Sequence, residues 1–380
     1  MVEMYPARGG VLIGSATEFT KIVSSGESVY LWFKDYAVKV PKEFFESEYW
    51  ISYWLEDSPT FYWYSFTDLE EYVEYVAKSV KDKIEGKRIY VSFSGGKDST
   101  SSLVILDMLR EYVNFKVRVG YVHMPYLEPL DNISEAERIA SKLGFNIEIL
   151  APPESRVRSY LFREGLPYRG RRWCTYLKVR TLREDKKKFE ANFEVKGDRL
   201  GECRKRFDRL KVQLRGNLFI EGKKFKPVFP LTILDILKIV REKGVVHKSY
   251  RAGCPRVSCS LCPYKSVFEF KVCGEVNDPG LIDSVLWHQY NRWYSYRVSF
   301  EDFKDYALWR YLPQQTPVIM NLRKRVNVEE EKITVKDIAE LYSSAWTILL
   351  PKALQVDLET IRTRILGKKE LKGIVTPDNI

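Results

Sequence analysis

The sequence is short of the features that would place it in a membrane or outside the cell. No apolar run approaches the roughly 18 residues that a membrane-spanning helix needs. The first residues, MVEMYPARGG, lack the basic and then apolar order of a signal peptide. Histidine is scarce too, because the chain has only 3, at His123, His247 and His288. We therefore expect a cytoplasmic protein without membrane contacts and without a histidine-rich metal site.

What the sequence does contain is enough apolar material for folded domains and an excess of positive charge. Of its 380 residues, 45% are hydrophobic and 14% aromatic, which excludes disorder as the main state and allows two or three domains. Lys and Arg number 62 against 51 Asp and Glu, for a formal net charge of +11. The resulting field favours anionic partners such as nucleotides, nucleic acids or acidic headgroups.

The order of apolar and polar segments predicts an α/β fold. From residue 87 onwards, β-prone runs at 88–93, 116–123 and 146–150 alternate with helical patterns at 99–112 and 134–143. Such alternation predicts a doubly wound, Rossmann-like parallel sheet. The expected regions are a small β-containing module at 1–67, a linking helix at 68–86, the α/β domain at 87–253, a cysteine-rich segment at 254–275 and a mainly helical C-terminal region at 276–380.

The clearest local signal is a glycine-containing turn between a predicted strand and a predicted helix. It reads Ser94, Gly95, Gly96, Lys97, Asp98, Ser99, Thr100. Paired glycines let backbone N–H groups approach an anion, and a helix N-terminus adds partial positive charge. The spacing is not that of a Walker A loop. This turn is typical of a phosphate-binding loop.

The cysteines suggest a site for a soft metal or for redox chemistry. Cys254, Cys259 and Cys262 have the spacing C-x4-C-x2-C, in which the last two thiolates can reach one metal. Iron–sulfur clusters, zinc and redox dithiols all use this spacing, so all three stay open on the residues alone.

Four motifs in order resemble a known family. Ser94 to Ser99 match the signature of PP-loop ATP pyrophosphatases, and three later elements match the branch that is similar to phosphoadenosine phosphosulfate (PAPS) reductases. These elements are Arg171-Arg172-Trp173-Cys174-Thr175-Tyr176-Leu177-Lys178, then Gly197-Asp198-Arg199-Leu200-Gly201-Glu202-Cys203-Arg204-Lys205-Arg206, and finally Tyr250 and Gly253 followed by Cys259-Ser260-Leu261-Cys262-Pro263. The resemblance covers residues 87 to about 270.

The resemblance implies roles for individual residues. It places ATP and Mg²⁺ at the loop from Ser94 to Thr100, with Lys97 and Asp98 catalytic and Asp98 a contact for the Mg²⁺ ion. It also implies that Arg199 and Arg206 contact phosphate or sulfate, with Arg199 catalytic. Cys174, Cys259 and Cys262 are matched as ligands of a [4Fe-4S] cluster, with zinc as the alternative and Cys174 also counted as catalytic. Trp173 replaces one cysteine of the family pattern, so the fourth ligand is expected to be Cys254, with Cys273 or an open position as alternatives.

Two departures decide between the activities that the resemblance implies. The phosphate loop is intact, whereas it is degenerate in sulfonucleotide reductases, and no cysteine follows Cys273 to act as their C-terminal nucleophile. We therefore expect an enzyme that cleaves ATP to AMP and pyrophosphate and adenylates an acceptor for sulfur transfer. Basic stretches at 169–172 and 186–188 favour tRNA or DNA as the acceptor, with a separate sulfur donor or reductant protein. A PAPS reductase and a nucleotide-binding module without turnover are the alternatives.

Overall fold

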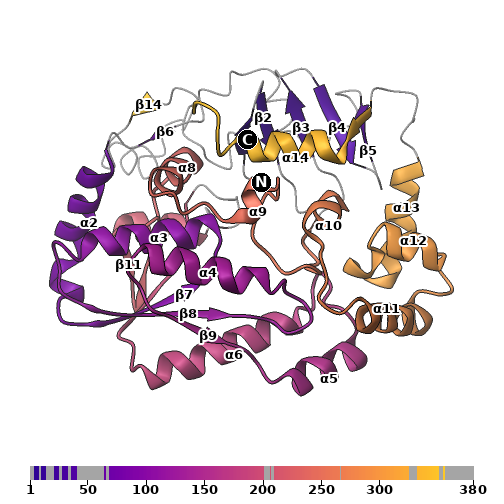
Figure 1. Cartoon of the computed structure of the whole chain (residues 1–380), viewed down its shortest axis with the longest axis horizontal. Helices are drawn as coiled ribbons and strands as arrows, with labels where there is room; N and C mark the ends of the chain where they lie inside the picture. The colour runs from indigo at the N-terminus through magenta and orange to yellow at the C-terminus, as the bar shows by residue number, and fades with distance from the viewer. Residues whose placement is uncertain are drawn as a thin grey trace.

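A six-stranded sheet of mainly parallel strands forms the centre of the protein (Figure 1). The computed structural model describes residues 4–7, 10–13, 21–24, 28–32, 36–40, 64–65, 68–200, 206, 209–265, 267–324, 332–350 and 354–355. The central sheet has the order β11-β12-β10-β7-β8-β9, in which only β11 runs antiparallel to its neighbour. Figure 1 draws α3 and α4 above this sheet and α6 below it. The predicted doubly wound α/β fold is confirmed.

The elements of this layer follow the chain in alternation. Its strands are β7 (Arg88–Phe93), β8 (Lys116–Val122), β9 (Ile147–Leu150), β10 (Phe193–Val195), β11 (Ile220–Glu221) and β12 (Lys224–Phe225). Its helices are α2 (Leu69–Ile84), α3 (Lys97–Leu109), α4 (Asp131–Lys142), α5 (Glu154–Glu164), α6 (Trp173–Lys188), the 3-10 helix η3 (Lys211–Arg215), α8 (Ile233–Glu242) and α9 (Lys248–Arg251).

A second sheet combines both ends of the chain. Strands β1 (Met4–Ala7), β2 (Gly10–Ile13), β3 (Lys21–Ser24), β4 (Ser28–Trp32) and β5 (Tyr36–Val40) pair in sequence order. The sixth strand, β13 (Lys332–Thr334), comes from the C-terminal region and pairs with β5 in antiparallel fashion. The short strands β6 (Tyr64–Ser65) and β14 (Leu354–Gln355) form a further parallel pair. The proposed domain boundaries stay a prediction.

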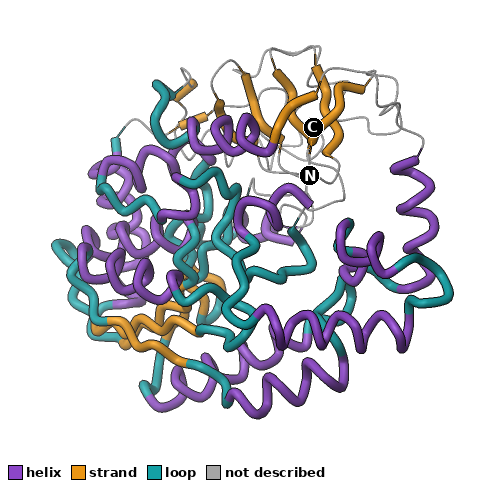
Figure 2. Tube along the Cα trace, turned by 45° about the vertical axis from the view of Figure 1, so that its right-hand side comes forward, coloured by secondary structure: helices purple, strands orange, loops and turns teal. Residues whose placement is uncertain are grey.

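The C-terminal region is helical, as expected. It contains α10 (Val267–Cys273), α11 (Pro279–Trp293), α12 (Phe300–Asp305), α13 (Thr316–Lys324), α14 (Val335–Ser344) and the 3-10 helices η4 (Leu308–Arg310) and η5 (Pro313–Gln315). Figure 1 and Figure 2 show α11, α12 and α13 on the side of the molecule away from α2, whereas α14 lies beside the second sheet. Within the described residues, no helix is long and apolar enough to cross a membrane.

Two hydrophobic cores are present, and the second one positions the site. The first core packs the central sheet against α2, α3, α4 and α8. The second joins α5 and the start of α6 to the C-terminal helices, and includes Leu161, Trp173, Val285 and Leu308. Cys174 and Cys259 pack against this second core. The cysteine-bearing segments are thus held by the C-terminal helices as well as by the sheet.

Candidate active site

The predicted phosphate loop joins β7 to α3 at the carboxyl end of the parallel strands. Gly95 has φ +70°, in the left-handed region that favours glycine. Ser99 Oγ donates to the Gly96 carbonyl at 2.8 Å and lies 2.9 Å from Ser94 Oγ, which closes the turn. Gly96 itself provides no side-chain cap. Tyr250 accepts the hydrogen bond of the Lys97 N–H, and the partial positive charge of the helix N-terminus still favours an anion at the loop. This geometry suits the pyrophosphate part of a nucleotide.

Two cations converge on one carboxylate in the first turn of α3. Lys97 Nζ lies 3.2 Å from Asp98 Oδ2, and Arg199 Nε lies 2.5 Å from Asp98 Oδ1. Lys97 and Arg199 are 5% and 2% exposed. Gly197 allows Arg199 to reach this position, because a Cβ on Gly197 would lie 3.1 Å from the backbone carbonyl carbon of Asp98. The structure therefore brings together three of the predicted catalytic residues.

The contacts of Asp98 bear on its predicted role as a contact for Mg²⁺. Each of its carboxylate oxygens already faces a cation, Lys97 on one side and Arg199 on the other. In this arrangement Asp98 positions the two cations, and its contact with Mg²⁺ stays a prediction.

Two other residues, Arg206 and Thr100, were also predicted to contact phosphate. Arg206 NH1 lies 3.3 Å from the carboxylate of Asp198, the residue before Arg199. Thr100 is buried in the first turn of α3, and its hydroxyl has no hydrogen-bond partner within the described residues. Cys203 lies outside the described residues.

His247 is a residue of this site that the sequence analysis did not identify. It caps α9 by accepting a hydrogen bond from the backbone N–H of Ser249 at Nδ1, so the neutral ring carries its proton on Nε2. This Nε2 is buried and has no partner within the described residues. A Cβ added to Gly95 would lie 3.7 Å from it. His247 therefore presents an N–H donor beside the phosphate loop.

The buried ring of His247 makes the stability of the protein sensitive to acid. Burial, assisted by Arg138 and Lys248 and opposed by Glu135, lowers its pKa to about 4. The unfolded chain therefore takes up a proton between about pH 6.5 and pH 4 that the folded protein does not, and stability falls as the pH drops through this window. We expect His247→Gln to remove up to about 3 kcal/mol of this acid destabilisation, measured by urea unfolding at a series of pH values. The matched control is His288→Gln, at an exposed position of α11. An unchanged pH slope in His247→Gln would contradict the assignment.

Among the described residues, three free cysteines lie near the carboxyl end of β8. Cys174, Cys259 and Cys262 are only partly exposed and form no disulfide. They are near enough to affect one another's ionisation. Burial raises the pKa of Cys259 to about 12 and that of Cys174 as well. At neutral pH these two side chains are therefore protonated thiols, which are weak nucleophiles compared with thiolates.

A buried ion pair lies beside these thiols. Lys178 Nζ is 2.8 Å from Glu128 Oε2, and the same carboxylate accepts hydrogen bonds from Tyr121 Oη at 2.6 Å and from the thiol of Cys259 at 3.9 Å. Burial lowers the pKa of Lys178, but the neighbouring Cys259, Glu128 and Cys174 outweigh it and raise the pKa overall. Lys178 therefore stays charged next to the thiols and can stabilise an anionic sulfur.

The segment that carries the cysteine pair is packed directly against the phosphate loop. A Cβ on Gly95 would lie 3.7 Å from Val257 Cγ1, two residues before Cys259. Tyr250 Oη accepts a hydrogen bond from the Lys97 backbone N–H at 2.9 Å. The backbone N–H of Ser260 donates to the Leu127 carbonyl at 2.8 Å, close to the end of β8. Nucleotide loop and thiols thus belong to one site at the carboxyl edge of the sheet, where α/β proteins bind ligands.

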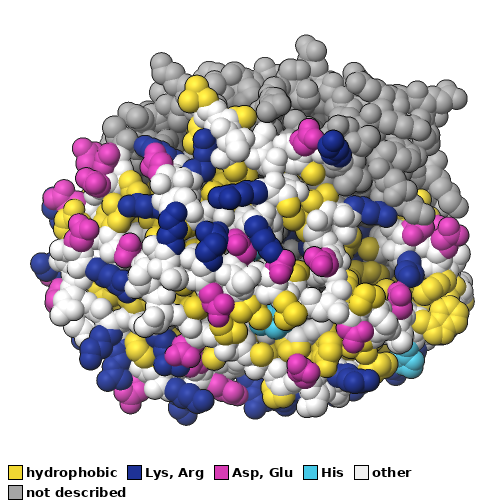
Figure 3. All heavy atoms as spheres, in the orientation of Figure 1, with side chains coloured by type: hydrophobic (Ala, Val, Ile, Leu, Met, Phe, Trp, Pro, Cys, Tyr) yellow, Lys and Arg dark blue, Asp and Glu magenta, His cyan; other side chains and the backbone are white. Residues whose placement is uncertain are grey.

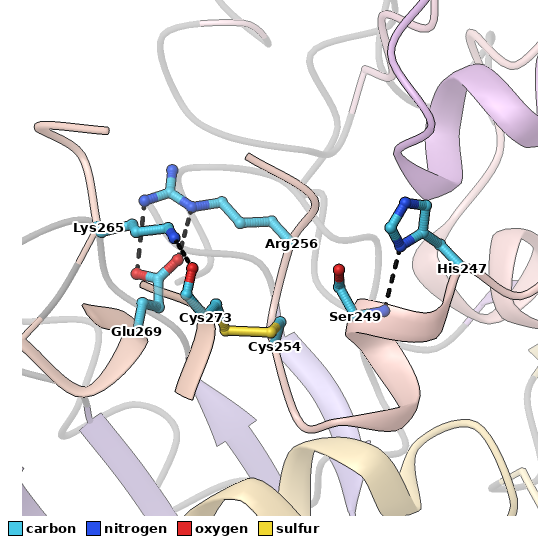
Figure 4. Close-up of a disulfide and its surroundings, with 7 residues drawn as sticks. All are labelled: His247, Ser249, Cys254, Arg256, Lys265, Glu269 and Cys273. Carbon is cyan, nitrogen blue, oxygen red and sulfur yellow. Dashed lines mark hydrogen bonds and ion pairs between the residues drawn. A yellow bond between two sulfur atoms is a disulfide. The ribbon is translucent and has the colours of Figure 1, made fainter. Parts of the chain in front are cut away.

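A disulfide closes the loop around the cysteine pair (Figure 4). It joins Cys254 to Cys273, 19 residues apart. Arg256 Nε lies 2.8 Å from Glu269 Oε1, which adds a second cross-link between the same two segments. Lys265 Nζ donates to the Cys273 carbonyl at 2.5 Å, and burial lowers the pKa of this lysine to about 8.

This disulfide corrects the expected ligand set. Cys254 was expected to be the fourth metal ligand, with Cys273 as an alternative, but each sulfur is bonded to the other and neither offers a thiolate. In addition, the described part of the chain contains no group of three or more His, Cys, Asp or Glu side chains arranged to hold a metal ion. The thiols of Cys174, Cys259 and Cys262 have the right chemistry for a soft metal but do not form a closed site as folded. We derive no reaction step through a cluster.

Positive charge gathers on one face of the molecule. Figure 3 shows Lys and Arg side chains over the middle of the face on which Figure 1 draws α4, α8 and α9. Exposed cations of these elements and their ends are Lys142, Lys243, Lys248 and Arg251. Lys248 forms an ion pair with Asp131, so part of this charge is compensated.

The α/β layer and the loop at the N-terminus of α3 give this part of the chain the architecture of a PP-loop domain. Residues 88–265 match the phosphoadenosine phosphosulfate reductase domain family. This part of the chain belongs to that family and to the PP-loop ATP pyrophosphatase superfamily.

Two curated relatives are similar to the chain over 250 residues each. An uncharacterized protein of Methanocaldococcus jannaschii is 28% identical over 62% of this chain, and the chain spans about half of that relative, 48% of its length. A protein of Shewanella woodyi named tRNA-cytidine(32) 2-sulfurtransferase is 27% identical over 60% of this chain and 72% of its own length.

Solved structures give weaker likenesses. The U34-tRNA thiolase NcsA from Methanococcus maripaludis with its [4Fe-4S] cluster is 12% identical, with 79% of this chain and 90% of that chain covered and a TM-score of 0.35. NMN synthetase from Francisella tularensis is 11% identical, with 60% and 96% covered and a TM-score of 0.33. TM-scores this low do not establish a common fold.

Proposed function

We propose that the protein is an ATP-dependent sulfurtransferase that thiolates a nucleic acid, with tRNA as the first candidate. The observation that carries this proposal is the packing of the free-thiol segment against an intact phosphate loop, with Val257 beside Gly95. A relative named as a tRNA-cytidine(32) 2-sulfurtransferase also supports sulfur transfer to tRNA as the proposed reaction.

The ATP half of the reaction follows from the phosphate loop. An oxygen of the acceptor attacks the α-phosphorus of ATP, the bond between the α-phosphorus and the bridging oxygen breaks, and pyrophosphate leaves. Charge builds on pyrophosphate in this step, and Lys97, Arg199 and the Nε2–H of His247 are placed to stabilise it. Mg²⁺ would supply further charge neutralisation there.

The sulfur half uses the thiols. A sulfur donor protein converts one thiol to a persulfide, whose outer sulfur attacks the adenylated carbon of the acceptor and expels AMP. A second thiol then attacks the cysteine sulfur of the mixed disulfide and releases the thiolated acceptor. The two thiols are left as a disulfide, which an external dithiol must reduce. The charged Lys178 stabilises the anionic sulfur in these steps.

The iron–sulfur cluster, with zinc as its alternative, is a proposal from the family resemblance that does not rest on the geometry. Cys174, Cys259 and Cys262 are the residues that would hold it. Iron, zinc and acid-labile sulfide measured on protein purified without oxygen test this point.

The test of the whole reaction is the formation of a thionucleoside. Anaerobically purified protein is incubated with ATP, Mg²⁺, a persulfide donor, a dithiol and either unmodified tRNA or DNA, and the digested nucleic acid is analysed by mass spectrometry. We expect a nucleoside heavier by the exchange of oxygen for sulfur, formed only with ATP. In parallel, PAPS is supplied with the dithiol. Sulfite release from PAPS without ATP cleavage would overturn the proposal in favour of a reductase, and ATP binding with turnover of neither substrate would favour a nucleotide-binding module.

A further inference from the structure

A pocket of about 270 Å³ lies between the connection from α5 to α6 and the C-terminal helices. Residues of three segments line it, including Glu164, Tyr168 and Arg171 from the first, Gln289 and Trp293 from α11, and Gln314 from η5. We propose that this pocket binds a single nucleobase of the acceptor nucleic acid. The inference deepens the proposed function and rests on it for the identity of the ligand.

The lining has the chemistry that recognises a base. Trp293 and Tyr168 offer aromatic surfaces on which a flat heterocycle can stack, and the side-chain amide of Gln314 offers a donor and an acceptor for the edge of a base. The volume is close to the lower end for small-molecule sites, about 300 Å³, which suits one base and not a whole dinucleotide.

The wall of the pocket is rigid. Gln289 is 1% exposed, and its side-chain oxygen accepts a hydrogen bond from the backbone N–H of Leu166 at 2.9 Å. Gly165 has φ +71°, and a Cβ there would lie 2.6 Å from the Gln289 side chain, so the close approach of the two segments favours glycine at this position. These contacts fix the position of Gln289 in one wall of the pocket, and a fixed wall favours binding because less conformational freedom is lost.

The charge around the pocket suits a polyanion. Arg171 and Arg163 have 61% and 60% of their side chains exposed, while their common partner Glu164 is 15% exposed. Arg292 lies over the Trp293 ring, 4.8 Å from its centroid. Three arginines therefore accompany one carboxylate, and the excess positive charge can contact the phosphates that flank the bound base.

The same connection also reaches the thiols. Arg169 Nε donates to the carbonyl of Pro263, the residue after Cys262, at 2.9 Å. Arg172 lies over the Tyr264 ring, 5.0 Å from its centroid. Cys174 follows Arg171 by three residues. A nucleic acid held by a base in the pocket would therefore lie next to the sulfur-carrying groups.

The pocket is separate from the expected ATP site. No residue that lines it belongs to the phosphate loop, to α3 or to the segment 247–257 that packs on that loop. Its walls are formed by elements of the second hydrophobic core, whereas α3 belongs to the first. This separation favours a base of the acceptor over the adenine of ATP.

The test is the affinity for short, unstructured, fluorescein-labelled RNA and DNA oligonucleotides, measured by anisotropy at fixed salt with the full-length protein. One set carries an abasic site in place of a central base. We expect Trp293→Ala and Tyr168→Ala each to weaken binding of the intact oligonucleotides by about 5- to 100-fold, since loss of one stacked base costs about 1–3 kcal/mol. We expect Trp293→Phe to retain most of the affinity. The matched control is Trp287→Ala on the same helix, which removes an exposed aromatic ring that stacks on Tyr290 outside the pocket.

Several results would overturn the inference. The first is that the protein binds no oligonucleotide, and the second is that Trp293→Ala and Tyr168→Ala leave the affinity unchanged. The third is an equal loss of affinity in Trp287→Ala and Trp293→Ala. The fourth is that ATP displaces the oligonucleotide from the site that depends on Trp293. AMP formation by the wild-type protein with ATP, Mg²⁺, tRNA, a persulfide donor and a dithiol separates this inference from the proposed function. Binding that depends on Trp293 in a protein that makes no AMP would leave the pocket standing and remove the sulfurtransferase. Thiolation that proceeds equally well in Trp293→Ala would leave the sulfurtransferase standing and refute the base-binding role of the pocket.

Discussion

Replacing Lys97 by Ala is expected to lower the rate of ATP cleavage by about 100- to 1,000-fold, the size of effect seen when a charge-stabilising donor is removed from an active site. The ammonium group is 3.2 Å from the Asp98 carboxylate and sits in the first turn of α3, where the leaving pyrophosphate is expected. Arg199 still balances Asp98 in the variant, so the fold should survive. The measurement is the initial rate of AMP formation, with thermal unfolding to confirm the fold.

Two further variants test whether the loss of activity in Lys97→Ala is specific to the charge at this position. Lys83→Ala removes an exposed lysine of α2 and should leave the rate unchanged. Lys97→Arg keeps the charge and should recover part of the activity, because a planar guanidinium cannot fully replace a compact ammonium group. A Lys97→Ala protein that cleaves ATP at the wild-type rate would remove the phosphate loop from the mechanism.

At least two of the variants Cys174→Ser, Cys259→Ser and Cys262→Ser are expected to abolish thiolation, by about 1,000-fold or more, because the mechanism uses two thiols, while cleavage of ATP with release of pyrophosphate continues. Each variant lacks one of the free thiols, and a hydroxyl neither carries persulfide sulfur nor resolves a mixed disulfide. The measurement is the yield of thionucleoside against the yield of pyrophosphate in the same reaction.

The disulfide supplies the matched control. Cys273→Ser removes the bond to Cys254 but leaves the three free thiols in place, so it should retain thiolation and lose thermal stability by an amount typical of such bonds, about 2–4 kcal/mol. Loss of thiolation in Cys273→Ser as complete as in Cys259→Ser would contradict the separation of structural from reactive cysteines.

Parts of the site that neighbouring residues form could be predicted from the sequence. Parts that depend on contacts between residues far apart in the chain could not. The loop from Ser94 to Ser99 was predictable because a strand, two glycines and a helix start lie next to one another in the chain. The contact between Arg199 and the Asp98 carboxylate joins residues 101 positions apart, and the motifs alone do not show it. The donor at His247 depends on a cap on α9 and on packing against Gly95, and neither leaves a pattern in the sequence.

The cysteines show the same limit. Their spacing predicts that Cys259 and Cys262 can act together, and the structure keeps both as free thiols. Spacing alone cannot tell that Cys254 pairs with Cys273, because that pairing depends on how α10 folds back, helped by the Arg256–Glu269 ion pair. Likewise, β13 completes the N-terminal sheet through a pairing between residues about 300 positions apart, for which no local signal exists.

The most direct test of the central claim is the identity of the products formed from ATP. ATP labelled at the α-phosphate is incubated without oxygen with the protein, Mg²⁺, a persulfide donor, a dithiol and unmodified tRNA, and the nucleotides and pyrophosphate are separated. The account predicts AMP and pyrophosphate in equal amounts, with a rate that rises when tRNA is added. Formation of ADP and phosphate, or no cleavage at all, would contradict it.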